Sequence, residues 1–292
     1  MRLAPRYILL LSILALLVPG GVLALSPDRL PSQYLYDRYG REHGLPSDTV
    51  WVARQDHEGY LWLGTKNGLA RFDGVRFTLY NKQAYPEFLS NDVRDIEITA
   101  DGSLWLATYG GGALRLIDGE FEPLTKADGL ADNVVHDIHI GSDGAVWFAT
   151  ALGISRLRDD TITNWTSEDG LADNSTFRVG EDSNGDIWVG TLTNGLSHFD
   201  GETFRNYSDG SGLDSTQVHL LFDDPELGLI ATTITGSSYR LEAGGPACWR
   251  GRCRHNCPGI RRSATGTATC GWAPMARACG ACRRTSSWRR SR

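Results

Sequence analysis

The segment Leu61-Trp62-Leu63-Gly64-Thr65 decides the fold, because the chain repeats it at nearly constant intervals. Copies occur at Leu104–Thr108, Val146–Thr150 and Ile187–Thr191, and a fifth copy without tryptophan occurs at Gly228–Thr232. From one tryptophan to the next, and then to Leu229 in the fifth copy, the spacings are 43, 42, 41 and 41 residues. A constant period of this length indicates a repeat architecture.

Glycine turns divide each repeat into four short apolar segments. In the first repeat these turns are Gly44-Leu45, Glu58-Gly59 and Asp73-Gly74, with one more after Thr65. Glycine reaches positive φ without steric cost, so acidic-glycine pairs between alternating runs indicate hairpins. Four antiparallel strands per repeat, without helical periodicity, are typical of a propeller blade. We therefore predict an all-β protein: a β-propeller of about five intact four-stranded antiparallel blades in an incomplete ring.

Two further predictions follow from this plan. The repeated tryptophans should be structural and fill the space between neighbouring blades; they are Trp62, Trp105, Trp147 and Trp188. The segment Tyr34–Tyr39 resembles the closing strand of a repeat and should complete the last blade, which would hide an exposed sheet edge.

The stretch Arg54–Gly74, with its Asp-x-x-Gly-x-Leu-Trp-x-Gly-Thr core, resembles the two-component regulator propeller repeat. The resemblance covers about residues 30–240. It implies an extracytoplasmic sensor. Long members of the family continue into a β-sandwich, a transmembrane helix and a histidine kinase or diguanylate cyclase. Rings in this family usually have seven blades, so five repeats imply a truncated propeller.

Both ends of the chain differ from the repeats. Residues 1–24, with Arg2, Arg6 and the apolar run Tyr7–Val18, are predicted to be a signal peptide, although an uncleaved anchor remains an alternative. Either interpretation predicts export, to the periplasm or outside the cell. Blades are assigned to residues 30–243. Residues 244–292 contain all six cysteines and no acidic residue, which we interpret as a frameshifted, unstructured tail; the alternative is a small cysteine-rich or metal-binding module.

The sequence indicates no catalytic residue, cofactor or metal. The region before the tail is acidic, which argues against nucleic acid as a partner. The histidines show no metal-ligand spacing, and Asp182–Asp186 lacks the frame of a calcium loop.

Positions that differ between repeats are the better candidates for binding. Five of them lie just after the start of the innermost strand of a repeat: Trp51, Arg94, His136, Phe177 and His219. Four more lie in the turn before that strand: Asp48, Asn91, Asn133 and Asn174. Together they would line one mouth of the channel and suit a carbohydrate or another polar small molecule. The alternative is that the Asp and Asn residues only cap turns.

These observations favour a non-catalytic, ligand-sensing fragment of a two-component or cyclic-di-GMP receptor. One alternative is a secreted scaffold that binds protein or carbohydrate. A propeller lyase or glycosidase is less favoured, because no carboxylates or histidines converge in the pattern. The parent protein is expected to be a membrane-anchored receptor, and whether it dimerises stays open.

Overall fold

The computed structural model describes residues 37–209, 211–242, 244–250, 260–262 and 268–270. It divides into two compact units, Met1–Tyr39 and Gly40–Arg292, and the second contains every described strand. The predicted signal peptide, the start of the proposed closing strand and most of the tail lie outside the described residues. Within the described ranges, no helix has both the length and the apolar character needed to cross a bilayer.

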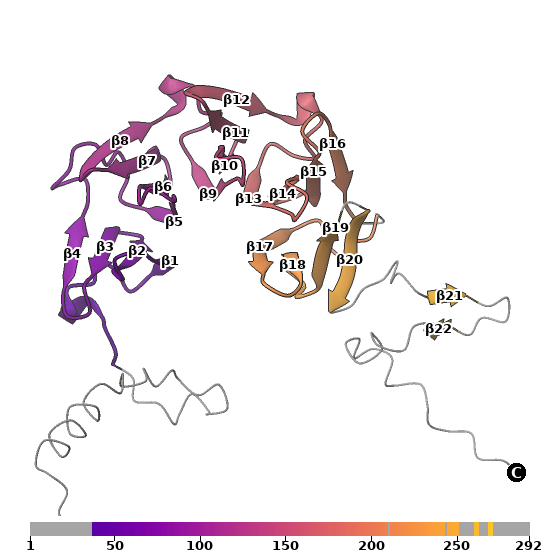
Figure 1. Cartoon of the computed structure of the whole chain (residues 1–292), viewed down its shortest axis with the longest axis horizontal. Coiled ribbons are helices and arrows are strands. Elements are labelled where there is room, and N and C mark those ends of the chain that lie inside the picture. The colour runs from indigo at the N-terminus through magenta and orange to yellow at the C-terminus, as the bar shows by residue number, and fades with distance from the viewer. Residues whose placement is uncertain (1–36, 210, 243, 251–259, 263–267, 271–292) are drawn as a thin grey trace, which may run out of the picture. The chain divides into compact units, whose positions relative to one another are not determined.

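Five sheets of four antiparallel strands follow one another along the second unit (Figure 1). Blade 1 is β1 (Val50–Gln55), β2 (Leu61–Thr65), β3 (Gly68–Phe72) and β4 (Phe77–Tyr80). Blade 2 is β5 (Val93–Ile98), β6 (Leu104–Thr108), β7 (Gly112–Ile117) and β8 (Glu120–Leu124). Blade 3 is β9 (Val135–Ile140), β10 (Val146–Thr150), β11 (Gly153–Arg158) and β12 (Thr161–Trp165).

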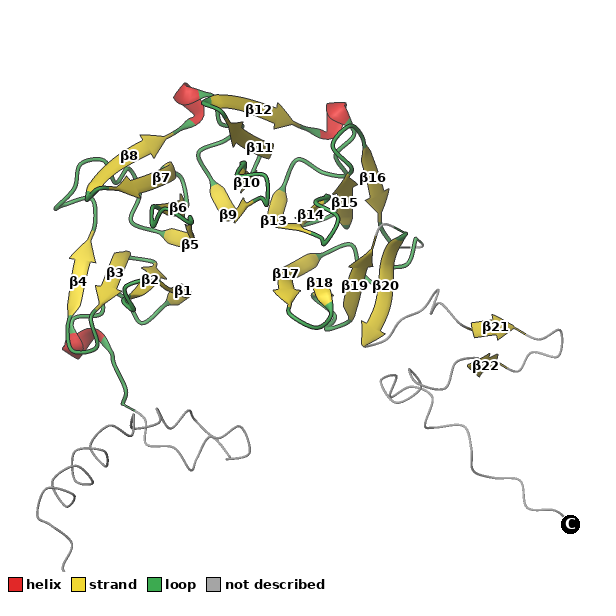
Figure 2. Cartoon of the chain, in the orientation of Figure 1, coloured by secondary structure: helices red, strands yellow, loops and turns green. Residues whose placement is uncertain are grey.

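Blade 4 is β13 (Thr176–Glu181), β14 (Ile187–Thr191), β15 (Leu196–Phe199) and β16 (Phe204–Tyr207). Blade 5 is β17 (Val218–Asp224), β18 (Gly228–Thr233), β19 (Ser238–Glu242) and β20 (Gly245–Arg250). Short 3-10 turns at Arg41–His43, Lys126–Asp128 and Ser167–Asp169 precede blades 1, 3 and 4 (Figure 2). A separate strand pair, β21 (Ile260–Arg262) and β22 (Ala268–Cys270), lies beyond the blades. The five sheets confirm the predicted all-β blade architecture.

The fifth blade differs from its sequence assignment in two details. β20 pairs with β19 and completes the sheet, so the blades continue beyond residue 243, because strand pairing needs only backbone groups and tolerates the changed composition. The pairing register also places Ile230, and not Leu229, at the tryptophan position: Thr233 bonds the Ser237 carbonyl as Thr191 bonds that of Gly195. The segment between Thr191 and Thr233 is therefore one residue longer than the spacing to Leu229 indicates, and the repeat spacing alone does not reveal this.

Neighbouring blades pack face to face. We call the side of a blade that contacts the preceding blade its leading face, and the side that contacts the following blade its trailing face. On the trailing face of blade 1, Trp62 and Leu69 pack against Val93, Ile96 and Leu106 on the leading face of blade 2. The same arrangement recurs at the three later junctions. All four repeated tryptophans are buried there, at 0 to 6% exposure.

The innermost strands are β1, β5, β9, β13 and β17, and each contacts the next. β1 and β17 stand at the two ends of this series (Figure 1). The strands in the middle of the series are partly or fully buried, whereas most residues of β1 are exposed. A side chain at one repeat position of these strands therefore lies next to its counterpart in the following blade.

Candidate functional site

A β-bulge interrupts every innermost strand at the same repeat position. Its extra residue is the one between Val50 and Val52 in blade 1, and between Val93 and Asp95 in blade 2. Blades 3, 4 and 5 repeat it. The five extra residues are Trp51, Arg94, His136, Phe177 and His219. A bulge turns a side chain away from the pleat, which frees it from blade packing and often marks a functional site.

These five side chains form one continuous row, which we call the inner ladder. The Arg94 guanidinium lies 4.3 Å from the Trp51 ring and 4.8 Å from the Tyr109 ring. Tyr109 lies 6.1 Å from His136. His136 lies 5.3 Å from Phe177, and Phe177 lies 6.0 Å from His219. The structure therefore brings together the five residues that the sequence singled out by their variation.

Two residues that sequence comparison missed belong to this ladder. Tyr109 is 49% exposed and fills the gap between Arg94 and His136. Asp92 accepts a hydrogen bond from Trp51 Nε1 at 2.9 Å and from Arg94 Nη2 at 2.8 Å, and so fixes both side chains. Asp92 could have been suspected, since Asn or Ser stands near this place in other repeats, but Tyr109 comes from the turn after β6 and has no sequence signal.

The middle of the ladder places the Arg94 guanidinium and Tyr109 beside the partly buried His136 imidazole. Burial, and then the charges of Arg94 and Arg178, lower the pKa of His136. Arg178 stacks on the Phe177 ring at 4.3 Å and donates to the Phe177 carbonyl oxygen at 3.0 Å. The result is a surface of flat rings and planar cations, which suits stacking more than proton transfer.

Beneath the ladder lies a buried acidic pair. Asp95 Oδ2 accepts the Ile138 backbone N–H at 3.1 Å, and Asp137 Oδ2 accepts the Val179 N–H at 2.9 Å, so each carboxyl group links its blade to the next. Burial, and then the Glu97 charge, raise the pKa of Asp95 to about 6. Burial, and then the Asp95 charge, raise the pKa of Asp137 well above its usual value.

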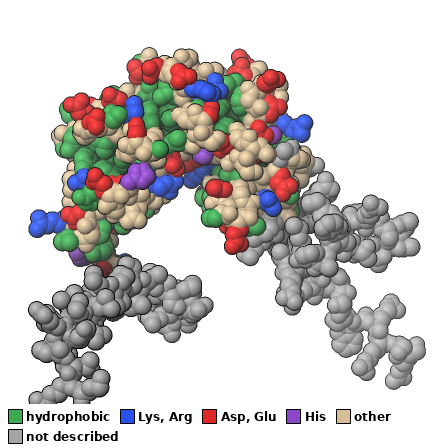
Figure 3. All heavy atoms as spheres, viewed as in Figure 1, with side chains coloured by type: hydrophobic (Ala, Val, Ile, Leu, Met, Phe, Trp, Pro, Cys, Tyr) green, Lys and Arg blue, Asp and Glu red, His purple; other side chains and the backbone are tan. Residues whose placement is uncertain are grey.

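Ion pairs extend this row toward both sides. Arg54 lies 3.8 Å from Asp95 and 2.9 Å from Glu97. Arg178 lies 3.5 Å from Asp137. His139 of blade 3 lies 3.5 Å from Glu181 of blade 4. Figure 3 shows basic, acidic and histidine side chains close together along the inner side of the blades.

The asparagines predicted in the turns form hydrogen bonds with backbone groups. The carboxamide oxygens of Asn91, Asn133 and Asn174 accept backbone N–H groups of Lys82, Lys126 and Ser167 at 2.8, 2.7 and 2.6 Å. They hold the loop that leaves one blade against the turn that enters the next, as the turn-capping alternative predicts. Asp48 is exposed in the corresponding turn of blade 1.

Asp182, Asp186 and His198 form a cluster whose ligand atoms lie within 4.8 Å of one another. Asp182 accepts the Trp188 indole N–H at 3.0 Å and the Asn184 N–H at 2.8 Å, while Asp186 contacts His198 at 2.9 Å. Hydrogen bonds within the cluster therefore already account for these groups.

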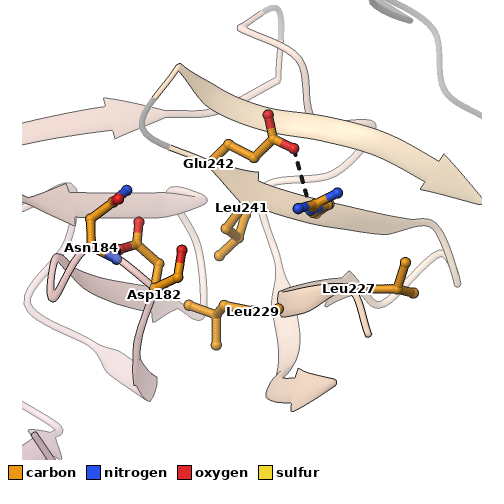
Figure 4. A pocket seen from close by; sticks show the side chains of 9 residues that line it. Asp182, Asn184, Leu227, Leu229, Leu241 and Glu242 are labelled. Carbon is orange, nitrogen blue, oxygen red and sulfur yellow. Dashed lines mark hydrogen bonds and ion pairs between the residues drawn. The ribbon is translucent and has the colours of Figure 1, made fainter. Parts of the chain in front are cut away.

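The same carboxylate–indole bond occurs in blade 1, where Asp56 accepts the Trp62 N–H at 2.7 Å. Blades 1 and 4 thus share this bond, whereas Thr99 and Gly141 stand at the same position before Trp105 and Trp147. A pocket of about 120 Å³ adjoins Asp182, and Figure 4 shows Leu229 and Leu241 of blade 5 on its other side. An ion pair between Glu242 and Arg240 crosses that side at 3.3 Å.

The family model described as "Two component regulator propeller" matches residues 44–67, 87–110 and 170–193. Each match runs from the turn before an innermost strand to the turn after a tryptophan strand. Blades 1, 2 and 4 therefore match the two component regulator propeller repeat. By sequence, no curated protein matches the chain significantly.

Solved structures with the same fold are only distantly similar in sequence. The extracellular domain of the putative hybrid two component system BT3049 from B. thetaiotaomicron superposes with a TM-score of 0.57 and 21% identity, covering 69% of this chain and 28% of that domain. The corresponding domain of BT4673 from B. thetaiotaomicron gives 0.59 and 19%, covering 68% and 30%. Virginiamycin B lyase from Staphylococcus aureus gives 0.56 and 16%, covering 68% of each chain. This chain thus spans less than a third of the two extracellular domains, and the likeness shows the fold.

Proposed function

We propose that this regulator propeller is the ligand-sensing, non-catalytic part of an extracytoplasmic receptor of the two-component or cyclic-di-GMP type. The observation that supports it best is the inner ladder. In all five blades a bulge at one repeat position presents a side chain to the same surface, and its type varies between tryptophan, arginine, histidine and phenylalanine. Repeat positions that carry the same residue in every blade maintain the fold. A row of positions whose residues vary is therefore where specificity for a ligand would reside.

The chemistry of the ladder favours a polar small molecule or a carbohydrate. Trp51 is 45% exposed and Tyr109 is 49% exposed, so their rings offer apolar faces to a ligand. The Arg94 guanidinium between them adds hydrogen-bond donors. The two imidazoles contact aromatic rings, which favours recognition over acid–base chemistry.

Export of the chain is part of this proposal, because the receptors that resemble it sense from outside the cytoplasm. The charged start and apolar run of residues 1–24 support it. Fusing these residues to alkaline phosphatase, which is active only after export, tests it directly: an inactive fusion would contradict a periplasmic or secreted location.

A binding screen tests the sensing role. The exported chain is applied to an array of oligosaccharides, and the best-bound saccharide is titrated by calorimetry. Trp51→Ala should weaken its binding at least about tenfold, the loss expected for one stacked anchor. Val75→Ala is the control, because Val75 is 76% exposed and lies in the turn between β3 and β4, the two outer strands of blade 1. Equal affinity of the two variants would contradict the ladder as the site.

A further inference from the structure

Every junction between blades in this chain joins a leading face to a trailing face. At the first junction, Val93, Ile96 and Leu104 of blade 2 are 0 to 4% exposed because blade 1 covers them. Since all the blades share one register, the same positions in any blade form a surface shaped for a trailing face.

The leading face of blade 1 has the same positions but is exposed. Val50 and Leu61 correspond to Val93 and Leu104, and they are 40% and 38% exposed. Ala53, which corresponds to the buried Ile96, is also exposed. Uncovered apolar faces of this kind are characteristic of interaction surfaces.

The inner part of the trailing face of blade 5 is likewise exposed and unusually apolar. Leu220 stands at the position where Asp95 and Asp137 bond the next blade, and Phe222 at the position where Arg54 reaches Glu97. Leu220 is 42% exposed and Phe222 is 45% exposed. Ile230, at the tryptophan position, is buried, so the exposed part of this face is β17.

One chain therefore presents both halves of the junction it uses four times internally. The two halves lie on the terminal blades of the series, with three blades between them, so they do not meet within the described chain (Figure 1). In blades 2 and 3 the junction includes a buried carboxylate, whereas here leucine would face Ala53 and Val50. No buried carboxylate would need a partner there, which suits a contact between separate molecules.

We propose that two copies of this chain associate head to tail, with β17 and the trailing face of blade 5 in one copy docking on the leading face of blade 1 in the other. The contact is heterologous, so the two surfaces involved are different. Each copy keeps one free half, and association can continue beyond the dimer.

Complementation between two variants tests this arrangement. Leu61→Asp damages only the leading face and Leu220→Asp only the trailing face. Sedimentation velocity of the exported chain between about 1 and 100 µM, the range of weak to moderate interfaces, should show growing oligomers for the wild type. Each variant alone should be monomeric, with association at least about tenfold weaker. An equimolar mixture of the two should form dimers and nothing larger, because only one intact pair of faces remains.

Leu152→Asp is the matched control, because Leu152 is 48% exposed in a turn of blade 3, and it should associate like the wild type. Circular dichroism identifies a variant that loses its sheet, and Val50→Asp with Phe222→Asp then replaces the pair. A wild type that stays monomeric throughout this range overturns the proposal, as does a mixture that remains monomeric. Oligomers that persist in both single variants also overturn it, since they would require a different surface.

Discussion

Substituting Asp95 by asparagine should change how the stability of the propeller blades depends on pH. Asp95 is 6% exposed, and its carboxylate accepts the Ile138 N–H while Arg54 lies 3.8 Å away. An amide oxygen can accept the same N–H, and Arg54 keeps its shorter contact with Glu97. The variant therefore removes an ionisable group and preserves the contacts around it.

The magnitude follows from the raised pKa. Burial moves the pKa of Asp95 from 3.8 to about 6, so the folded protein binds this proton more tightly than the unfolded chain. Its contribution is fully present below the unfolded value and is lost as the pH rises through about 6. The shift corresponds to about 3 kcal/mol in total, of which about 2 kcal/mol is lost between pH 4.5 and pH 8. The variant lacks this loss and also lacks the Asp95 charge that helps raise the pKa of Asp137, so its stability relative to the wild type should rise by about 2 kcal/mol or more over that range.

Urea unfolding of both proteins at pH 4.5, 6 and 8 measures the difference. The contribution of His136 to the pH dependence is the same in both proteins, so the comparison removes it. Because the pKa of His136 is lowered, its contribution to stability is lost as the pH falls below 6.5, which is the opposite direction to that of Asp95. The comparison also removes the contribution of acids such as Asp101, which titrate in a lower pH range. Asp48→Asn removes an exposed carboxylate from the same region and should run parallel to the wild type. If Asp95→Asn also runs parallel, Asp95 does not carry the raised pKa.

Two further predictions concern the blades themselves. Gly195→Ala and Gly201→Ala place alanine at similar φ values, 88° and 97°, and this backbone conformation costs each variant about 1–2 kcal/mol. A Cβ at residue 195 would also lie 2.0 Å from the Tyr207 carbonyl oxygen, whereas a Cβ at residue 201 would have no atom within 4 Å. Thermal melts should show the larger loss for residue 195, and equal losses would contradict that clash. Trp188→Ala should cost about 3–5 kcal/mol, because its fully buried ring fills the junction of blades 4 and 5, whereas Trp51→Ala should cost about 1 kcal/mol or less; similar losses would show that Trp188 is not the packing residue described here.

The sequence predicted the blades because their physics is local and periodic. A tryptophan strand between glycine turns recurs wherever a blade must pack on its neighbour, and Trp62 and Trp188 occupy equivalent buried places. The five ladder positions could be grouped for the same reason, since equal spacing in a repeat means equal position in the fold. The repeat spacing does not show whether a side chain accepts a hydrogen bond from a backbone N–H group. The three asparagines of the turns therefore resembled ligand contacts, although each of them accepts a backbone N–H group.

The buried acidic pair escaped sequence reasoning for a different reason. Asp95 and Asp137 stand one residue after the bulge, at a position where the other blades have valine, arginine and leucine, so the repeat marks no acid there. Only the juxtaposition of β5, β9 and β13 shows that each carboxylate meets a backbone N–H of the next blade, with Arg178 beside the second of them. Arg178 also stacks on Phe177, so the charge that stabilises the ionised form of Asp137 is in direct contact with the ladder. A ligand that displaces Arg178 would raise the pKa of Asp137 further. Occupancy of the ladder and protonation of the acidic pair are therefore expected to be linked.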